Sequence, residues 1–125
     1  MITLYNGTIV SKKDMRTWIE ALRSGKYKQT KDVLQDKNGF CCLGVACEIF
    51  IPKDDKTLTI DGMLYGIFPK NQNSPKWLQH INCDFAHKTS GLELSILNDE
   101  KGYSFNQIAD ELEKTYLGEE NEKEN

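Results

Sequence analysis

Residues 39–51 read Gly-Phe-Cys-Cys-Leu-Gly-Val-Ala-Cys-Glu-Ile-Phe-Ile, a predominantly apolar stretch. From residue 43 to residue 51, every side chain is apolar or small except that of Glu48. A helix that is apolar on nearly every side is buried, and Pro52 ends this one because proline cannot continue a helix. The stretch therefore predicts a central buried helix over residues 43–51, in which Gly44 permits the close approach of another backbone segment.

The residues on the N-terminal side of this helix predict a hairpin. Residues 26–34 are expected to be extended, and residues 40–42 form the second extended piece. Between them, residues 36–39 read Asp-Lys-Asn-Gly, and these residue types favour turns. Alternate side chains of an extended segment share a face, so we expect Tyr27 and Gln29 to point the same way.

Two amphipathic helices are predicted near the ends of the chain. The first begins at Ser11, which can cap the free amides together with Asp14 three residues later, and it ends at Gly25. The second begins at Ser104, with Gln107 completing the same capping pattern. In both helices the apolar residues recur with helical spacing. These apolar stripes are Met15, Trp18, Ile19 and Leu22 in the first helix, and Phe105, Ile108, Ala109 and Leu112, extended by Tyr116, in the second.

Shorter elements are predicted in the rest of the chain. Residues 2–10 and residues 57–65 each contain two strand-like runs separated by Asn-Gly or Asp-Gly, the strongest local signal for a hairpin. Ser74-Pro75 predicts the start of a short helix. Residues 92–97 are helical or extended, and the stretch from 82 to 91 has no clear pattern.

The length and composition indicate one folded domain. The chain has 125 residues, of which 38% are hydrophobic and 28% charged, as in ordinary globular proteins. Helices and antiparallel hairpins are mixed along it, which is typical of the α+β class. We therefore expect a compact single domain over residues 1–117, with amphipathic helices packed on short antiparallel hairpins, and a charged C-terminal tail over residues 118–125.

Charge and hydropathy bear on the kind of partner. The formal net charge is −3, and Arg16 and Arg23 are the only arginines among 16 basic residues, so nucleic acid is not an expected partner. The most apolar run, at residues 49–51, is far too short to cross a membrane. The N-terminal residues lack the pattern of a secretion signal. We expect a cytoplasmic protein without a membrane partner; the oligomeric state stays open.

The four cysteines could indicate an enzyme. In the cytosol they are expected to be thiols, and Cys42 precedes a helix, where a thiolate can be stabilised. A cysteine-dependent hydrolase or transferase centred on it could use His80 or His87 as base and Asn82, Asp84 or Asp99 to orient that base. However, Phe40, Leu43 and Val45 would bury the thiol, and burial in apolar surroundings raises its pKa and makes it unreactive. We therefore favour core packing and a protein that is not an enzyme, with the enzyme as the alternative.

Metal and cofactor motifs are missing from the sequence. It has no C-x-x-C pair, and Cys42 and Cys47 are spaced so that they do not share a helix face. It also lacks a glycine-rich phosphate loop and a nucleophile elbow. We expect neither a cofactor nor a bound metal.

Three stretches together resemble a known group of proteins. They are Trp-Ile-Glu-Ala-Leu-Arg-Ser-Gly-Lys-Tyr-Lys-Gln-Thr at 18–30, Gly-Phe-Cys-Cys-Leu-Gly-Val at 39–45, and Leu-Asn-Asp at 97–99 followed by Ser-Phe-Asn-Gln-Ile-Ala-Asp at 104–110. This order is similar to a widespread group of small phage and prophage proteins, most of them without an assigned activity. The resemblance implies an accessory protein in the host cytoplasm. Such a protein would counter antiviral defence by binding a defence effector or its nucleotide-derived signal.

A candidate binding surface follows from polar residues that the fold does not require. Tyr27 and Gln29 could offer an aromatic ring beside an amide, with lysines supplying positive charge for a base or an anion. The turn after residue 97 is expected to contribute, because binding residues gather in loops on a rigid scaffold. The candidate binding residues are Lys26, Tyr27, Lys28, Gln29, Lys31, Asn98 and Asp99.

Overall fold

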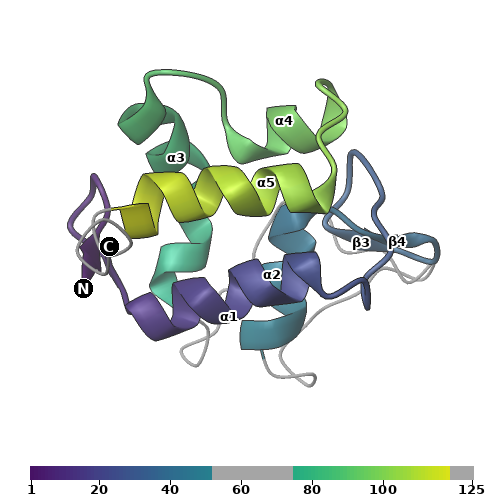
Figure 1. Ribbon diagram of the computed structural model, residues 1–125, viewed down its shortest axis with the longest axis horizontal. Coiled ribbons are helices and arrows are strands. Elements are labelled where there is room, and N and C mark those ends of the chain that lie inside the picture. The colour runs from purple at the N-terminus through teal and green to yellow at the C-terminus, as the bar shows by residue number, and fades with distance from the viewer. Residues whose placement is uncertain (52–74, 119–125) are drawn as a thin grey trace.

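Helices and two small hairpins make up the part of the chain that the computed structural model describes, residues 1–51 and 75–118 (Figure 1). In chain order the elements are β1 (Ile2–Thr3), β2 (Ile9–Val10), α1 (Lys12–Arg23), β3 (Gln35–Asp36), β4 (Gly39–Phe40), α2 (Cys42–Phe50), the 3₁₀-helix η2 (Lys76–Gln79), α3 (Ile81–Thr89), α4 (Leu94–Asp99), α5 (Phe105–Leu112) and its π-helical continuation η3 (Glu113–Leu117). Strands β1 and β2 pair antiparallel, as do β3 and β4. The protein is therefore a compact α+β domain, as predicted. None of the described helices is both long and apolar enough to span a bilayer.

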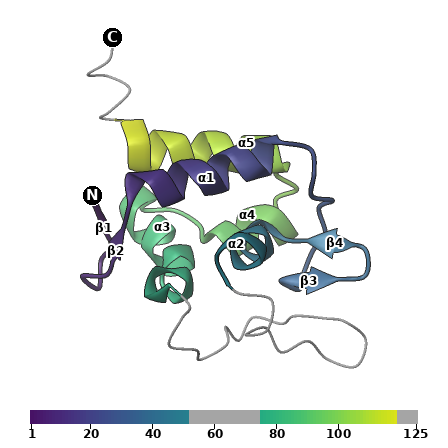
Figure 2. The same cartoon turned by 90° about the horizontal axis from the view of Figure 1, so that it is seen from below.

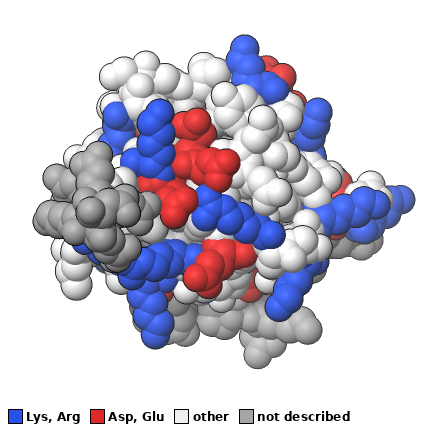
Figure 3. All heavy atoms as spheres, viewed as in Figure 1, with Lys and Arg blue, Asp and Glu red and all other residues white. Residues whose placement is uncertain are grey.

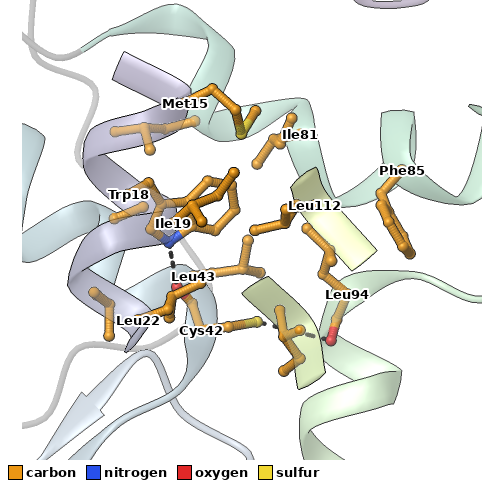
Figure 4. Close-up of a cluster of buried hydrophobic side chains, with 14 of the residues drawn as sticks. Met15, Trp18, Ile19, Leu22, Cys42, Leu43, Ile81, Phe85, Leu94 and Leu112 are labelled. Atoms are coloured by element: carbon orange, nitrogen blue, oxygen red, sulfur yellow. Dashed lines mark hydrogen bonds between the residues drawn. The ribbon is translucent and has the colours of Figure 1, made fainter. Parts of the chain in front are cut away.

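Helices α1 and α5 lie side by side and run antiparallel, and together they form one layer (Figures 1 and 2). Helices α2, α3 and α4 all lie on the same side of this layer (Figure 2). Both predicted N-caps are confirmed: each serine hydroxyl accepts a hydrogen bond from the backbone amide three residues later. The full capping box is present at Ser104, where the Gln107 side chain accepts from the Ser104 amide. All the side chains of the two predicted stripes are buried and meet in one core (Figure 4). At the surface, the Arg23 guanidinium lies 2.6 Å from Asp110 and 2.9 Å from Glu113, which ties α1 to α5 and η3.

The predicted central helix is confirmed as α2. It begins one residue earlier than expected because the sulfur of Cys41 acts as the N-cap and accepts a hydrogen bond from the Gly44 amide at 3.4 Å. Every residue from 42 to 47 is buried. The expected close approach is present too. A Cβ atom on Gly44 would overlap the carbonyl of Leu34, so only glycine lets this backbone lie against α2.

The hairpin before α2 differs from the prediction. Its first strand is Gln35–Asp36, not residues 26–34. The earlier segment contacts β4 at one point, where the Phe40 amide donates to the Lys28 carbonyl and the Thr30 amide donates to the Phe40 carbonyl. The chain then leaves the extended conformation at Asp32, which has a φ of 70°. The Asp32 amide bonds to the Asp99 carboxylate at 3.0 Å, and this distant contact bends the segment.

The N-terminal hairpin is confirmed, with a longer turn than Asn-Gly alone. The Leu4 amide donates to the Thr8 carbonyl at 2.8 Å, so three residues form the loop. Gly7 has a φ of 88°, the left-handed conformation that such three-residue loops require. The predicted hairpin at 57–65, the cap at Ser74 and most of the predicted tail lie outside the described residues. Helix α3 was not predicted, and α4 settles residues 94–99 as helical.

Candidate functional site

The structure brings Gln29 and the residues at the end of α4 together, as expected, but it uses them internally. The Gln29 side-chain amide donates at 2.8 Å to the side chain of Asn98 and at 2.8 Å to the carbonyl of Tyr103. Its oxygen accepts from the Phe105 amide at 3.1 Å. Gln29 therefore fastens the connection between α4 and α5.

Asn98 is fully buried and is saturated with hydrogen bonds. Its Nδ2 donates to the Thr30 carbonyl at 2.9 Å and to Asp99 Oδ1 at 2.8 Å. Its Oδ1 accepts from Gln29 and from the Cys42 amide, the latter at 3.3 Å. The prediction that Asn98 binds a ligand is therefore not supported: the residue joins the 26–34 segment, α2 and α4.

The other predicted residues lie at the surface. Lys26, Lys28 and Lys31 are exposed. Tyr27 packs edge-on against Phe40, with ring centroids 5.5 Å apart. Basic side chains also gather at the end of the molecule formed by β3 and β4 (Figure 3). The three lysines and Tyr27 do not line the groove described below. Of the predicted binding residues at the surface, Asp99 does line it.

The bonding of Gln29 leads to a prediction about stability. Gln29→Ala would leave three partners of the amide without their bond, so we expect the free energy of unfolding to fall by about 1–3 kcal/mol. Lys31→Ala, at an exposed position, is the control and should change it by about 0.5 kcal/mol at most. Urea denaturation measures both. Equal stability of the two variants would show that the Gln29 bonds contribute nothing.

A groove of about 310 Å³ lies where the 32–34 segment, the start of α2, α3 and α4 meet. Apolar side chains, among them Leu34 and Leu43, form part of its wall together with the thiol of Cys41. Its polar lining consists of Asp32, Gln79, Asn82, Cys83, Ser95 and Asp99. The groove thus combines an apolar wall with several polar groups that could orient a ligand.

The wall between α3 and α4 is held by Asn82. Its Oδ1 accepts from the Ser95 amide at 2.9 Å, and its Nδ2 donates to the Ser95 hydroxyl at 3.1 Å and to Glu93 Oε2 at 2.9 Å. On the opposite side, Asp99 Oδ1 accepts from the Asp32 amide at 3.0 Å. Both walls are therefore fixed by hydrogen bonds within the protein itself.

All four cysteines are free thiols, as predicted, and three of them are buried while Cys83 is exposed. Cys42 is 0% exposed, and its thiol donates to the Leu94 carbonyl at 3.8 Å (Figure 4). Burial raises the pKa of Cys42 well above its ordinary value, and burial raises the pKa of Cys41 to about 11. Both side chains are therefore protonated at neutral pH and are poor nucleophiles.

Most of the groups proposed to assist Cys42 have other partners, as described above for Asn82 and Asp99. Asp84 accepts hydrogen bonds from Tyr116 and Lys88, and the ring of His87 stacks on Tyr5 with centroids 4.6 Å apart. The geometry thus gives the Cys42 enzyme no support.

Sequence reasoning missed most of the groove. Asn82, Cys83 and Ser95 come from α3 and α4, where the spacing of apolar residues was ambiguous. The polar residue types themselves carried no local signal, because their positions depend on how the helices pack. Asp99 was predicted as a binding residue and does line the groove.

Comparison with known proteins identifies a family. No curated protein and no solved structure matches the chain. The family model described as "Domain of unknown function (DUF8296)" matches residues 11–116. This range runs from the N-cap of α1 into η3 and includes every described side chain that lines the groove. The chain therefore belongs to the DUF8296 family.

Proposed function

We propose that this domain is a non-catalytic binding protein that holds part of its partner in the groove between α2, α3 and α4. The resemblance to phage and prophage accessory proteins makes the partner a host antiviral defence effector or a nucleotide-derived signal. The observation that carries the proposal is the groove itself, with its apolar wall and convergent polar side chains. Binding at such a site would act by occupying the effector or by sequestering the signal.

Rigidity of the groove supports this proposal. The Asn82 bonds on one wall and the Asp99 bonds on the other are made without a ligand. A site that is already ordered loses little conformational entropy when the partner binds, which increases affinity. The alternative, an enzyme centred on Cys42, lacks an accessible nucleophile because that thiol is buried and bonded to Leu94.

Cys83 provides the test, because it is the exposed cysteine and lines the groove. Cys83→Trp places a large side chain there and should abolish the activity. The domain is expressed in bacteria that carry one of a panel of antiviral defence systems, and phage plating is measured. We expect the wild-type protein to restore plating at least tenfold against one of these systems, and Cys83→Trp to restore none.

Two controls make the test specific. Cys83→Ser leaves the groove open and should restore plating like the wild-type protein, while the thermal unfolding midpoint of each variant confirms that it folds. Cys42→Ser should cost stability and keep the activity; complete loss of activity in a folded Cys42→Ser protein would favour the enzyme. Full plating with folded Cys83→Trp would exclude the groove as the binding site.

A further inference from the structure

The charge of the groove bears on what it holds. Among the described residues that line it, the charged ones are Asp32 and Asp99, and both carry carboxylates. The two carboxylates belong to residues in direct contact, since the Asp32 amide donates to Asp99 Oδ1. The pKa of Cys41 at the groove wall is raised mainly by burial, and the charge of Asp99 adds to this effect.

A second hollow continues the groove along α3. It has a volume of about 300 Å³, shares Cys83 with the groove, and is lined by Glu93, Ala86 and His87 as well. Glu93 adds a third carboxylate, and its Oε2 lies 3.7 Å from the Cys83 sulfur. The two hollows thus place three carboxylates along a path that passes Cys83.

Size and charge together distinguish the two classes of partner. The groove volume of about 310 Å³ is at the lower end of the range for small-molecule sites, about 300–1,000 Å³, and suits one long side chain. Carboxylates repel the phosphates of a nucleotide-derived signal, whereas they attract a guanidinium or ammonium group. The methylene groups of lysine or arginine would also suit the apolar wall formed by Leu34 and Leu43.

We propose that the groove receives a lysine or arginine side chain from a basic segment of a partner protein, with Asp32 and Asp99 pairing with its charge and Glu93 attracting a second basic residue. This inference rests on the proposed function and narrows it to a protein partner. Asp99 is half-buried, so an ion pair with it is stronger than one on an open surface. Binding therefore depends on charge and weakens as salt screens it.

The test uses NMR titration of the whole 125-residue chain with three probes. They are the peptide acetyl-Gly-Arg-Gly-Lys-Gly-amide, the same peptide with glutamine at both basic positions, and ATP. We expect the basic peptide to shift the amide signals of groove residues such as Ser95 and Asp99, with a dissociation constant at least tenfold lower than that of the glutamine peptide. Raising the salt concentration from 50 to 300 mM should lower the affinity for the basic peptide severalfold.

A charge-neutral variant sharpens the test. The triple variant Asp32→Asn, Glu93→Gln, Asp99→Asn keeps side-chain size and a hydrogen-bond acceptor at each position. It should lower the affinity for the basic peptide at least tenfold. The matched control, Glu20→Gln, Glu100→Gln, Glu111→Gln, removes the same charge outside the groove lining and should change affinity less than twofold. The salt titration uses the wild-type protein, so it tests whether binding depends on charge even if the triple variant does not fold.

Other outcomes would overturn the inference. Equal binding of the basic and glutamine peptides, or shifts of the groove signals by ATP and not by the basic peptide, would contradict a cationic ligand while leaving a binding groove in place. If none of the probes shifts the groove signals, the inference is also wrong. The proposed function is decided separately, by the effect of Cys83→Trp on phage plating.

Discussion

Asp84→Ala is expected to lower the free energy of unfolding by about 3–5 kcal/mol. The Asp84 side chain is 0% exposed and accepts hydrogen bonds from the Tyr5 amide at 2.6 Å, the Tyr116 hydroxyl at 2.7 Å and the Lys88 ammonium at 3.0 and 3.1 Å. Alanine would remove all of these bonds and leave the donors without an acceptor. Urea denaturation at pH 7 measures the loss.

Tyr116→Phe is a milder change at the same hydrogen-bond cluster and is compared with Asp84→Ala. It removes a single hydrogen bond and keeps the ring packed, so we expect a loss of about 1–2 kcal/mol. The pKa of the Tyr116 hydroxyl is raised, mainly by burial and also by the hydrogen bond to Asp84, so the hydroxyl stays protonated and remains a donor. An Asp84→Ala protein as stable as Tyr116→Phe would contradict a central role for the carboxylate.

Gly44→Ala is the second change with a large expected effect. Alanine in a helix normally stabilises it by up to about 1 kcal/mol relative to glycine. Here its Cβ would overlap the Leu34 carbonyl oxygen and lie 2.6 Å from the carbonyl carbon, so one backbone segment has to move. Overpacking a core typically costs about 1–3 kcal/mol. Because the clash at Gly44 is with backbone, we expect a loss at or above the upper end of this range, about 3 kcal/mol or more, or failure to fold.

The matched control for Gly44 is Gly118→Ala. Gly118 also has helical backbone angles, and a Cβ there would meet nothing within 4 Å. We expect this variant to be as stable as the wild-type protein or slightly more stable. Thermal unfolding of both variants gives the comparison. A Gly44→Ala protein that unfolds at the wild-type temperature would show that α2 does not need the close contact with Leu34.

The sequence predicted the elements whose signals are local. Helices α1 and α5 have a capping residue and an apolar stripe within a few turns, and both signals can be identified without the rest of the fold. The contact of Gly44 was also predictable, because glycine inside a buried apolar helix usually marks a close approach. The identity of the segment that approaches it, at Leu34, was not.

Elements stabilised by distant contacts could not be predicted. Helix α3 buries Asp84 between apolar residues, and this carboxylate interrupts the stripe that would have marked the helix. Its partner Tyr5 is 79 positions away in the chain. Likewise, the 26–34 segment bends because Gln29 and Asp32 bond to residues 67 or more positions later. The groove depends on these same contacts, which is why Asp99 was the only one of its lining residues predicted to bind a partner.

The pairing of α1 with α5 has a consequence for protein synthesis. The two helices cover one another's apolar stripes, yet Arg23 ends the first and Phe105 begins the second. A ribosome adds about 5–20 residues per second, so the interval between them lasts about 4–16 s. Throughout that interval, Trp18 and its neighbours in α1 have no α5 to pack against. We therefore expect a nascent chain of this domain to bind chaperones that hold exposed apolar helices, and to be released once α5 has been synthesised.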